Sequence, residues 1–465
     1  MRWNEYHEAT KHSHASLQRN VHFLDWSNLP DPFRHYEGAP LLDLPADPAA
    51  PEIPALDVLS GHRGPAHESD DWVAFLSRLL FYSASISATK TTPSGDRYAL
   101  RVNPSSGNLH PTEFHFACPD GLYHYRPSSH ACDRRAAGDY GPLRFLLTTI
   151  AWREAWKYQS RAYRYCLHDA GHAAESLALA ARAMGCSART QAAFSDDELA
   201  REFQLAEDEW PLLIMHVDHG PSIAPAARRV WFGGVPNPLS PDVIEYPALE
   251  AMHAATKHGA PPELPPLEPP PRALGGPPFG DIVRRRRSAL DFQGGVRSID
   301  REQLTLLLEA GLRPPAARFD FGDYVELYAY VHRVRDVESG LYRVSEAGAL
   351  HLQQPGDQRA VATELSLDQE LAGNACVAFS MIGDLDRATR RHGDRGYRYV
   401  HFEAGAIGQR LYLAAEALGF QSTGMGAFYD DLVNKYLKLA PEAGQVVYHF
   451  ACGYAINDPR LFQVD

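Results

Sequence analysis

A short polar loop, RVNPSSGNLHPTE at residues 101–113, combines two hydroxyls, an amide and a glycine just before an alternating apolar stretch. Small residues allow the backbone to approach a flat polar ring or a phosphate, and hydroxyls and backbone amides supply donors. The same residue types also build most ordinary turns, so an ordinary turn is the alternative. The candidate ligand-binding residues are Pro104, Ser105, Ser106, Gly107 and Asn108.

A second candidate segment lies near the middle of the chain, where four consecutive arginines, 284–287, precede Ser288. Arginine forks bind phosphate through two parallel hydrogen bonds, and a neighbouring hydroxyl can add a third. Arg286, Arg287 and Ser288 therefore form a candidate phosphate clamp, although a run of charges is more often a solvated surface.

An internal repeat predicts the elements that position these segments. Residues 157–197 align without a gap on residues 391–431, with 16 of 41 positions identical, where composition alone would give roughly two or three. Each copy contains small and apolar residues at helical spacing and a glycine at the expected helix end, Gly185 or Gly419. Asp169 and Glu403 are expected to cap the first turns of these helices.

Strand patterns are repeated as well: GLYHY at 121–125 and GLYRV at 340–344 each follow an alternating apolar segment. Between the copies, residues 259–280 are so rich in proline that we expect neither a helix nor a central strand there. The predicted division is an N-terminal arm (1–60) packed on the surface, half 1 (61–250), a proline-rich linker (251–280) and half 2 (281–465). We expect the halves to pack face to face as a pseudo-dimer; an elongated pair of domains is the alternative.

Composition narrows the function classes. At 465 residues more than one domain is expected, and a net charge of −13 argues against nucleic acid as a partner. The six cysteines show no metal-binding spacing, so no metal site is predicted and reduced thiols are expected. No long apolar run predicts a membrane span or a signal peptide, which favours a cytoplasmic protein.

Taken in order, these segments resemble the nitroreductase family, and most closely its SagB-type dehydrogenase branch and related tandem proteins. The resemblance covers most of residues 60–465 and rests on the polar loop, Arg286-Arg287-Ser288, the repeated helix, GMGAF at 424–428, and Gly453-Tyr454 followed by Arg460. It implies an α+β fold, a mainly antiparallel sheet flanked by helices in each half, with FMN bound where two such units meet.

The resemblance also implies how the site is divided between the halves. Half 2 would hold the phosphate of FMN with Arg286, Arg287, Ser288, Gly424, Met425, Gly426 and Arg460, and half 1 would contribute residues 104–108. The mirror-image site is expected to be lost, because Thr190-Gln191-Ala192 replaces Gly424-Met425-Gly426, no Arg-Arg-Ser precedes Phe81, and residues 313–323 contain no Pro-Ser-Ser-Gly. One composite FMN site per chain is predicted.

One position departs from the family pattern. A Lys or Arg is usual two residues after the serine, where a cation stabilises the reduced flavin ring, but this chain has Leu290. Arg101 is the candidate replacement; the alternative is that Arg101 only pairs with a core carboxylate.

Lys157-Tyr158 matches a Lys-Tyr pair that SagB-type azoline dehydrogenases use to remove a proton from the substrate, and both are the candidate catalytic residues; a solvated Lys157 is the alternative. The resemblance implies an FMN-dependent oxidoreductase that moves a hydride to or from a small-molecule or peptide-like substrate, with NAD(P)H as a possible transient donor. The contrasting hypothesis is a non-catalytic flavin-binding or scaffold subunit. Further oligomerisation of the pseudo-dimer is possible.

Overall fold

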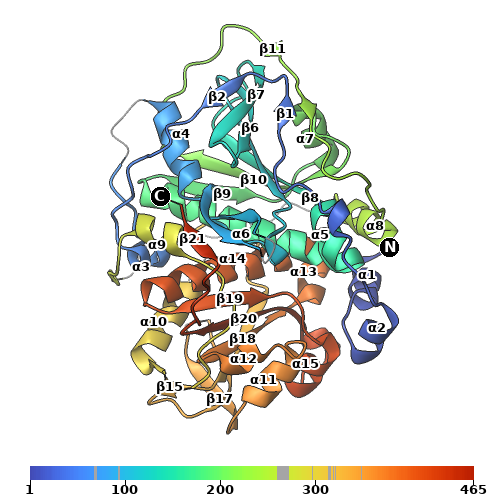
Figure 1. Cartoon of the computed structure of the whole chain (residues 1–465), viewed down its shortest axis with the longest axis vertical. Coiled ribbons are helices and arrows are strands. Elements are labelled where there is room, and N and C mark those ends of the chain that lie inside the picture. The colour runs from blue at the N-terminus through green and yellow to red at the C-terminus, as the bar shows by residue number, and fades with distance from the viewer. Residues whose placement is uncertain are drawn as a thin grey trace.

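The computed structural model describes residues 1–66, 71–92, 95–258, 272–295, 297–312, 316–317, 319, 321–346 and 348–464. It contains two α+β units, one above the other in Figure 1, each with its own sheet and with long helices between the sheets. Thin N-terminal and C-terminal segments cross from one unit to the other.

The upper sheet is antiparallel throughout, in the order β11-β7-β6-β5-β8-β10-β9, with β2 also paired to β7. Its strands are β2 (Leu41–Asp43), β5 (Thr112–Cys118), β6 (Gly121–Arg126), β7 (Ala131–Ala137), β8 (Arg144–Ile150), β9 (Ser187–Gln191), β10 (Glu209–Asp218) and β11 (Val230–Trp231). All seven residues of β5 are buried, which places this strand in the centre of the upper unit.

The lower sheet repeats this arrangement in the antiparallel order β17-β16-β14-β18-β20-β19. Its strands are β14 (Val325–Val331), β16 (Gly340–Val344), β17 (Leu350–Pro355), β18 (Val377–Gly383), β19 (Gln421–Met425) and β20 (Gln445–Gly453). The expected α+β class, with two similar units that each contain a mainly antiparallel sheet, is therefore confirmed.

The helices confirm the duplication residue by residue. Counterparts at an offset of 234 residues are α5 (Ala151–Tyr158) and α13 (Leu385–His392), the 3-10 turns η3 (Gln159–Arg161) and η4 (Gly393–Arg395), and the central helices α6 (Ala162–Ala183) and α14 (Gly396–Ala417). The helices α7 (Asp196–Phe203) and α15 (Asp430–Tyr436) begin at the same offset. Because α6 begins at Ala162, Asp169 lies two turns inside the helix, and the predicted role as a first-turn cap is wrong for it and for Glu403.

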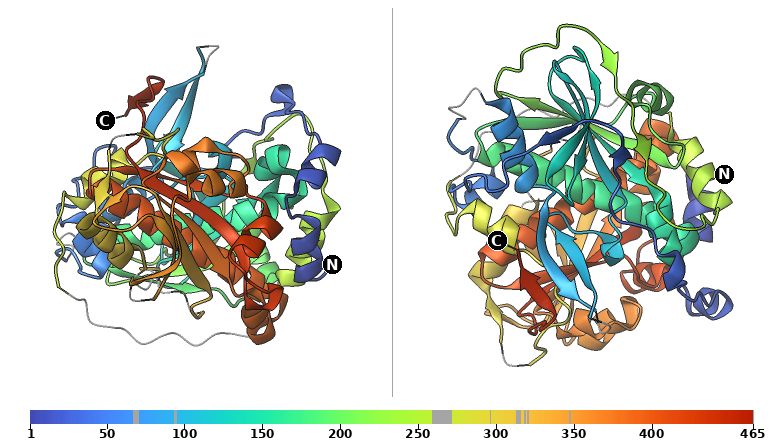
Figure 2. Two further views of the ribbon diagram at one scale, coloured as in Figure 1. Left: turned by 90° about the horizontal axis from the view of Figure 1, so that it is seen from below. Right: turned by 45° about the horizontal axis from the view of Figure 1, so that its top comes forward.

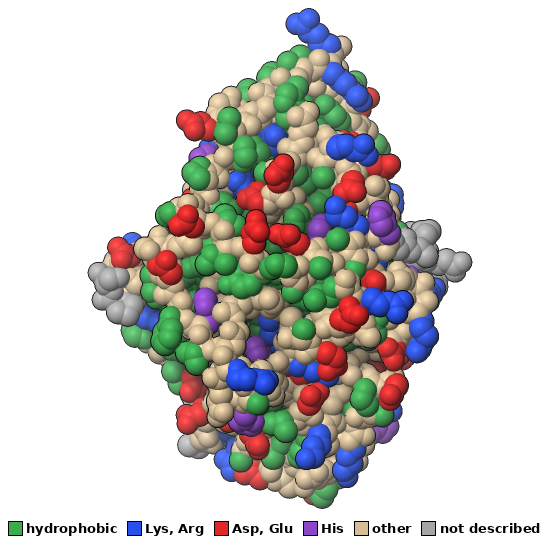
Figure 3. All heavy atoms as spheres, turned by 90° about the vertical axis from the view of Figure 1, so that its right-hand side faces the viewer, with side chains coloured by type: hydrophobic (Ala, Val, Ile, Leu, Met, Phe, Trp, Pro, Cys, Tyr) green, Lys and Arg blue, Asp and Glu red, His purple; other side chains and the backbone are tan. Residues whose placement is uncertain are grey.

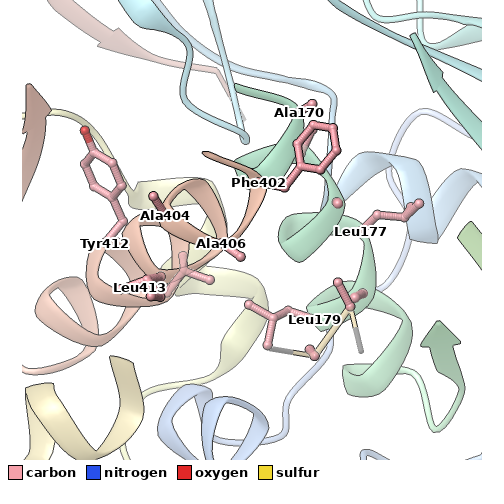
Figure 4. Close-up of a cluster of buried hydrophobic side chains, with 14 of the residues drawn as sticks. Ala170, Leu177, Leu179, Phe402, Ala404, Ala406, Tyr412 and Leu413 are labelled. Carbon is pink, nitrogen blue, oxygen red and sulfur yellow. The ribbon is translucent and has the colours of Figure 1, made fainter. Parts of the chain in front are cut away.

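The central helices cross at a pair of equivalent glycines. A Cβ atom on Gly171 would lie 2.2 Å from the Phe402 carbonyl oxygen, and one on Gly405 would lie 2.2 Å from the His168 carbonyl oxygen. The two backbones therefore touch where the pseudo-twofold axis passes. Figure 4 shows the apolar side chains around this crossing, including Ala170 and Leu177 from α6 and Phe402 and Ala406 from α14.

Equivalent buried ion pairs flank the crossing. Arg164 contacts Asp430 at 2.7 Å, and its counterpart Arg398 contacts Asp196 at 2.8 Å. All four side chains are nearly inaccessible to solvent. An identical set of contacts made in both directions is the signature of an isologous interface, here built within one chain.

The N-terminus belongs to this interface. The helix α1 (Trp3–Ala9) buries Tyr6 completely, with its ring about 6 Å from the rings of Tyr163 and Tyr397. The expectation of an arm that lies only on the surface therefore does not hold for α1.

A second short repeat explains this position, since HEATKH at 7–12 recurs as HAATKH at 253–258. The counterpart of α1 is α8 (Pro247–Thr256), and the following lysines bind equivalent aspartates, Lys11 to Asp431 at 2.8 Å and Lys257 to Asp197 at 2.6 Å. The start of the chain is thus equivalent to residues that the sequence-based division placed around the linker.

Most of the proline-rich segment, residues 259–271, lies outside the described residues. Residues 272–278 form no helix, but the first two residues of α9 (Phe279–Arg285) lie within the predicted linker. Its counterpart is α3 (Ala55–Ser60), and the residues just before these helices, Pro54 and Pro278, form a β-bridge.

A three-stranded sheet joins the two units at the site. The hairpin of β3 (Ile86–Thr91) and β4 (Arg97–Arg101) takes β21 (Leu461–Gln463), from the C-terminus, as its third strand; both views in Figure 2 show β21 beside this hairpin. The remaining elements are α2 (His14–Arg19), η1 (Trp26–Asn28), β1 (Tyr36–Glu37), α4 (Trp72–Phe81), η2 (Ser106–Asn108), β12 (Val235–Pro236), β13 (Ile299–Asp300), α10 (Arg301–Leu312), β15 (Val334–Arg335), α11 (Arg359–Leu365), α12 (Glu370–Asn374) and η5 (Pro441–Ala443).

All six cysteines are buried and none forms a disulfide. Within the described part of the chain, no helix combines the length and apolar character needed to cross a membrane. The same residues contain no cluster of His, Cys, Asp and Glu that could hold a metal ion.

Candidate active site

A cavity of about 310 Å³ lies where the two units meet, and its walls come from both. From the upper unit it takes Lys90, Tyr98, Leu100, Arg101, Asn103, Pro104, Ser105, Ser106, Gly107, Asn108, His110, Tyr158, Tyr165, Asp169 and His172. From the lower unit it takes Arg286, Arg287, Ser288, Gln369, Tyr412, Thr423, Gly424, Met425, Gly426, Ala427 and Tyr448. Apart from Arg460, the two predicted sets of cofactor-binding residues, far apart in the sequence, thus face one cavity.

The polar loop is held in place by its own side chains and by α6. Ser105 Oγ accepts a hydrogen bond from the backbone of His110 at 2.8 Å, while Ser106 donates its backbone N–H and its hydroxyl to Asp169 at 3.1 and 2.9 Å. Gly107 has φ of +59°, and a Cβ atom there would lie 2.8 Å from the Tyr158 hydroxyl. The loop is therefore preorganised, and a side chain at residue 107 would be both strained and crowded.

Arg286 joins the two halves at the cavity. Its guanidinium donates to the carbonyl oxygens of Val102 at 3.0 Å and Arg101 at 3.2 Å, both from the upper unit. The neighbouring Arg287 donates to the carbonyl oxygen of Ser87 at 2.7 Å, again across the junction. Arg286 and Arg287 are consequently buried connectors rather than part of the solvated surface that the sequence left as an alternative.

Close backbone approach shapes the opposite wall. The Tyr412 hydroxyl lies 2.8 Å from both Ser288 Oγ and the backbone nitrogen of Gly424, which fixes the serine beside the glycine turn. A Cβ atom on Gly424 would lie 2.0 Å from the Tyr448 hydroxyl, and one on Gly426 would lie 1.9 Å from the Tyr165 ring. A side chain at either position would have to displace a buried tyrosine.

Several buried polar atoms of these residues have no partner among the described residues: Arg101 Nε and Nη1, Asn103 Oδ1, His110 Nδ1, Arg286 Nη1 and Arg287 Nε. Burying an unpartnered donor costs about 1–3 kcal/mol. Most of these atoms are cationic donors, so the cavity is built for a ligand that is rich in acceptors and carries negative charge.

Arg101 lines this cavity and is buried, with one hydrogen bond to the Pro32 carbonyl oxygen at 2.6 Å. Burial lowers its pKa to about 10, so it remains charged at neutral pH. Among the described residues it forms no ion pair with a carboxylate, which favours the predicted cationic role over simple core pairing. Leu290, in contrast, is half exposed and does not line the cavity.

The structure does not bring Arg460 to the cavity. Its guanidinium forms a two-point contact with Asp458, at 2.8 Å for each bond, and its side chain is 40% exposed. Lys90 from β3 lines the cavity instead and contacts the same Asp458 at 3.1 Å. The sequence pattern missed Lys90 because it stands in an unremarkable strand, two elements before the polar loop.

Tyr158 lines the cavity, whereas Lys157 lies just behind its wall. The Lys157 ammonium would be 3.2 Å from a Cβ atom on Gly107, so it sits directly against the polar loop. Burial raises the pKa of Tyr158 well above its usual value, so the phenol stays protonated at neutral pH. These two residues therefore offer a hydroxyl inside the site and a cation next to it.

Two buried carboxyl groups lie beneath the polar loop. Burial raises the pKa of Asp169 to about 7, only partly offset by hydrogen bonds from Ser105 and Ser106. Burial, and then repulsion from Asp169, also raises the pKa of Glu154 well above its usual value. The pair therefore retains a proton near neutral pH. The equivalent of Glu154 in half 2 is Ala388, so half 2 has no equivalent of this carboxyl pair.

Because the pKa of Asp169 is higher in the folded than in the unfolded protein, folding takes up a proton between about pH 4 and 7. Stability should fall across this window as pH rises, by at most about 1.4 kcal/mol per pH unit for a single carboxyl. We expect Asp169→Asn to flatten the pH dependence of the melting temperature between about pH 4 and 7, measured by thermal denaturation. The exposed Asp139→Asn is the control, and a profile of Asp169→Asn as steep as the control's would contradict the assignment.

At the mirror-image position, the described residues pack closely against other parts of the chain. His62-Arg63-Gly64 follows α3 where Arg286-Arg287-Ser288 follows α9, and a Cβ atom on Gly64 would lie 1.9 Å from the Ala183 carbonyl oxygen. The backbone of Thr190 donates directly to Ala317 at 2.9 Å, and Phe321 stacks on Tyr399, the counterpart of Tyr165, at 4.6 Å. Residues 313–323 of the sequence contain no Pro-Ser-Ser-Gly loop. Of these, residues 313–315, 318 and 320 lie outside the described residues.

The model of the nitroreductase family matches residues 97–220 and 283–454, more than half of the chain, in two segments that correspond to the two units. The chain therefore belongs to the nitroreductase family, whose members are oxidoreductases, and it carries the family domain twice in tandem.

Two known proteins illustrate the similarity. A crystal structure from Anabaena variabilis, assigned as a nitroreductase, is 25% identical and superposes with a TM-score of 0.78 over 98% of this chain and 99% of that one. A protein of Methanocaldococcus jannaschii, also assigned as a nitroreductase, is 34% identical over 119 residues, which is 25% of this chain. The matched segment spans 59% of that relative's length.

Proposed function

We propose that this protein is an FMN-dependent oxidoreductase with one composite site per chain, acting by hydride transfer on a small-molecule or peptide-like substrate. The observation that supports this most directly is the convergence of unpartnered cationic donors from both halves, Arg101, Arg286 and Arg287, on a cavity whose opposite wall has two glycines packed against tyrosine side chains. FMN combines an anionic phosphate, hydroxyls and a flat ring with acceptor atoms along one edge, so these residues fit it.

When bound, FMN would supply a reversible two-electron store that exchanges a hydride with the substrate. Arg286, Arg287, Ser288 and Lys90 would hold the phosphate and its neighbouring hydroxyls. Gly424 and Gly426 would allow the ring to lie against the backbone, and Arg101 would place positive charge at the ring's polar edge.

Proton transfer would fall to Lys157 and Tyr158. Tyr158, kept protonated by burial, would donate a hydrogen bond or a proton into the cavity. Lys157, which lies next to the polar loop, would move protons to and from the cavity. NAD(P)H is the proposed transient electron donor, and oxygen is the proposed acceptor when the reaction runs as a dehydrogenation.

We expect Tyr158→Phe to bind FMN normally but to reduce kcat about 100-fold, because the loss of a positioned proton donor costs roughly that factor. The measurement is NADPH-dependent turnover of a quinone or nitroaromatic compound, together with the visible spectrum of bound flavin. Lys157→Met should behave similarly. Tyr436→Phe, on a tyrosine remote from the cavity, is the control. Equal activity of the cavity variants and the control would remove Lys157 and Tyr158 from the mechanism.

A non-catalytic flavin-binding subunit is the second candidate, and the closely packed mirror-image position and Leu290 favour it. The same experiment separates the two. A protein that binds FMN but shows no reduction of the flavin by NADPH, and no oxidation of chemically reduced flavin by quinones or oxygen beyond that of free FMN, would be a binding subunit.

A further inference from the structure

A second cavity, of about 440 Å³, opens beside the first, and Tyr158 lines both. Its walls are the segment from the end of α1 through α2 and the turn η3 that follows Lys157. Figure 3 looks onto the side of the molecule on which these N-terminal helices lie in Figure 1. A molecule in this second cavity would thus be separated from the proposed flavin site by one tyrosine side chain.

The second cavity is basic in an acidic protein. Its described lining contains six basic residues and no acidic one: Lys11, His12, Arg19, His22, Lys157 and Arg161. The chain as a whole carries a net charge of −13. A local concentration of positive charge against that background selects for anions.

Only some of these groups are free to bind a ligand. Lys11 contacts Glu8 and Asp431, and Arg161 contacts Asp430. Burial, with Arg161 nearby, lowers the pKa of His12 to about 3, so this ring is neutral. Among the described residues, Arg19 and Lys157 form no ion pair, which leaves two cations facing the cavity.

Two hydrogen bonds and one strained residue define the shape of the second cavity. Asn20, at the end of α2, donates a side-chain hydrogen bond to Gln159 in the turn, and His22 contacts the Trp156 carbonyl oxygen at 2.9 Å. Gln159 has φ of +51°, while its counterpart in half 2 is Gly393, with φ of +65°. A non-glycine residue in this region is strained, and such strain is typical of functional sites.

We propose that the second cavity binds a carboxylate group of the substrate through Arg19 and Lys157, so that the reacting part of the molecule extends past Tyr158 to the flavin. The inference rests on the proposed function and names its substrate class: carboxylic acids, including peptide-like ones. A guanidinium fork together with an ammonium matches a single carboxylate. Beyond His22, the exposed side chains of Phe23 and Trp26 (85% and 69%) offer apolar contact to the body of such an acid.

The test compares 4-nitrobenzoate with its neutral analogue 4-nitrobenzamide in NADPH-dependent turnover by the wild type and Arg19→Ala. We expect KM for 4-nitrobenzoate to rise roughly tenfold, equivalent to about 1.4 kcal/mol, with kcat and the values for 4-nitrobenzamide changed less than about twofold. Arg228→Ala, which removes an exposed arginine elsewhere, is the matched control and should leave both substrates unaffected.

Other outcomes would overturn the proposal. Equal effects on the acid and the amide would show that Arg19 does not bind a carboxylate. A rise in KM for NADPH instead would assign the cations to phosphate groups of the donor. Calorimetric titration of 4-nitrobenzoate into the flavin-free protein gives an independent readout. Binding there that depends on Arg19 would support the cavity even if the protein failed to take up FMN, which keeps this proposal separate from the proposed function.

Discussion

We expect Arg286→Ala to lower the affinity for FMN more than about 100-fold, or by about 3 kcal/mol. A buried charged hydrogen bond contributes about 1.5–3 kcal/mol, and this side chain supplies more than one. The wild type should bind one FMN per chain. In the variant, the carbonyl oxygens of Arg101 and Val102 lose their donor, so the polar loop loses its connection to half 2 as well. The measurement is a titration of flavin-free protein followed by flavin fluorescence.

Arg285→Ala is the matched control, because the adjacent Arg285 contacts Glu416 with a side chain that is 55% exposed, away from the cavity. Arg286→Lys keeps the charge and should bind with intermediate affinity, which guards against a simple folding defect. Two FMN molecules per wild-type chain would contradict the predicted loss of the mirror-image site. Flavin affinity of Arg286→Ala equal to that of Arg285→Ala would remove Arg286 from the cofactor site.

Gly405→Ala is expected to destabilise the whole protein by about 3 kcal/mol or more, the upper range for overpacked cores. The new Cβ atom would lie 2.2 Å from the His168 carbonyl oxygen and 3.1 Å from Gly171 Cα, so only a movement of an entire helix could relieve the overlap. The gain of about 1 kcal/mol that alanine normally brings to a helix is too small to compensate. Thermal denaturation of the variant measures the effect, and Gly171→Ala should behave in the same way.

Gly408→Ala, one turn further along α14, is the control because its nearest neighbours are the side chains of His172, at 2.8 Å, and Tyr448. Side chains can rotate where a helix backbone cannot, so this variant should melt closer to the wild type. If Gly405→Ala and Gly171→Ala unfold no earlier than Gly408→Ala, the central helices do not cross in close contact and the face-to-face arrangement is wrong.

The two arginine–aspartate systems explain why both glycines should matter to one unfolding transition. Arg164 with Asp430 and Arg398 with Asp196 lie on opposite sides of the crossing and are fully buried. Separating the helices would break both ion pairs and leave four charged groups without partners. Breaking one buried pair costs about 3–5 kcal/mol. The halves are therefore expected to unfold together rather than as independent domains.

The amino-acid sequence by itself determined the duplication, the α+β class and most of the segments that line the cavity. It could do so because a gap-free repeat and short glycine, serine and arginine motifs are local features, visible without knowing which residues meet in space. The sequence pattern missed the equivalence of α1 and α8 because this equivalence does not continue the gap-free repeat. Its offset is 246 residues rather than 234, since insertions separate it from the longer repeat.

Only the tertiary structure decided which side chains share the site. Asp169, interpreted from the sequence as a helix cap, lies in the middle of α6 beneath the polar loop, with Glu154 contributed by the preceding helix. Lys90 lines the cavity, whereas Arg460, which the motif assigned to the site, contacts Asp458 just before β21 pairs with β3. Such placements depend on how separate elements pack against one another. A pattern along the chain does not show which residues of different elements lie close together.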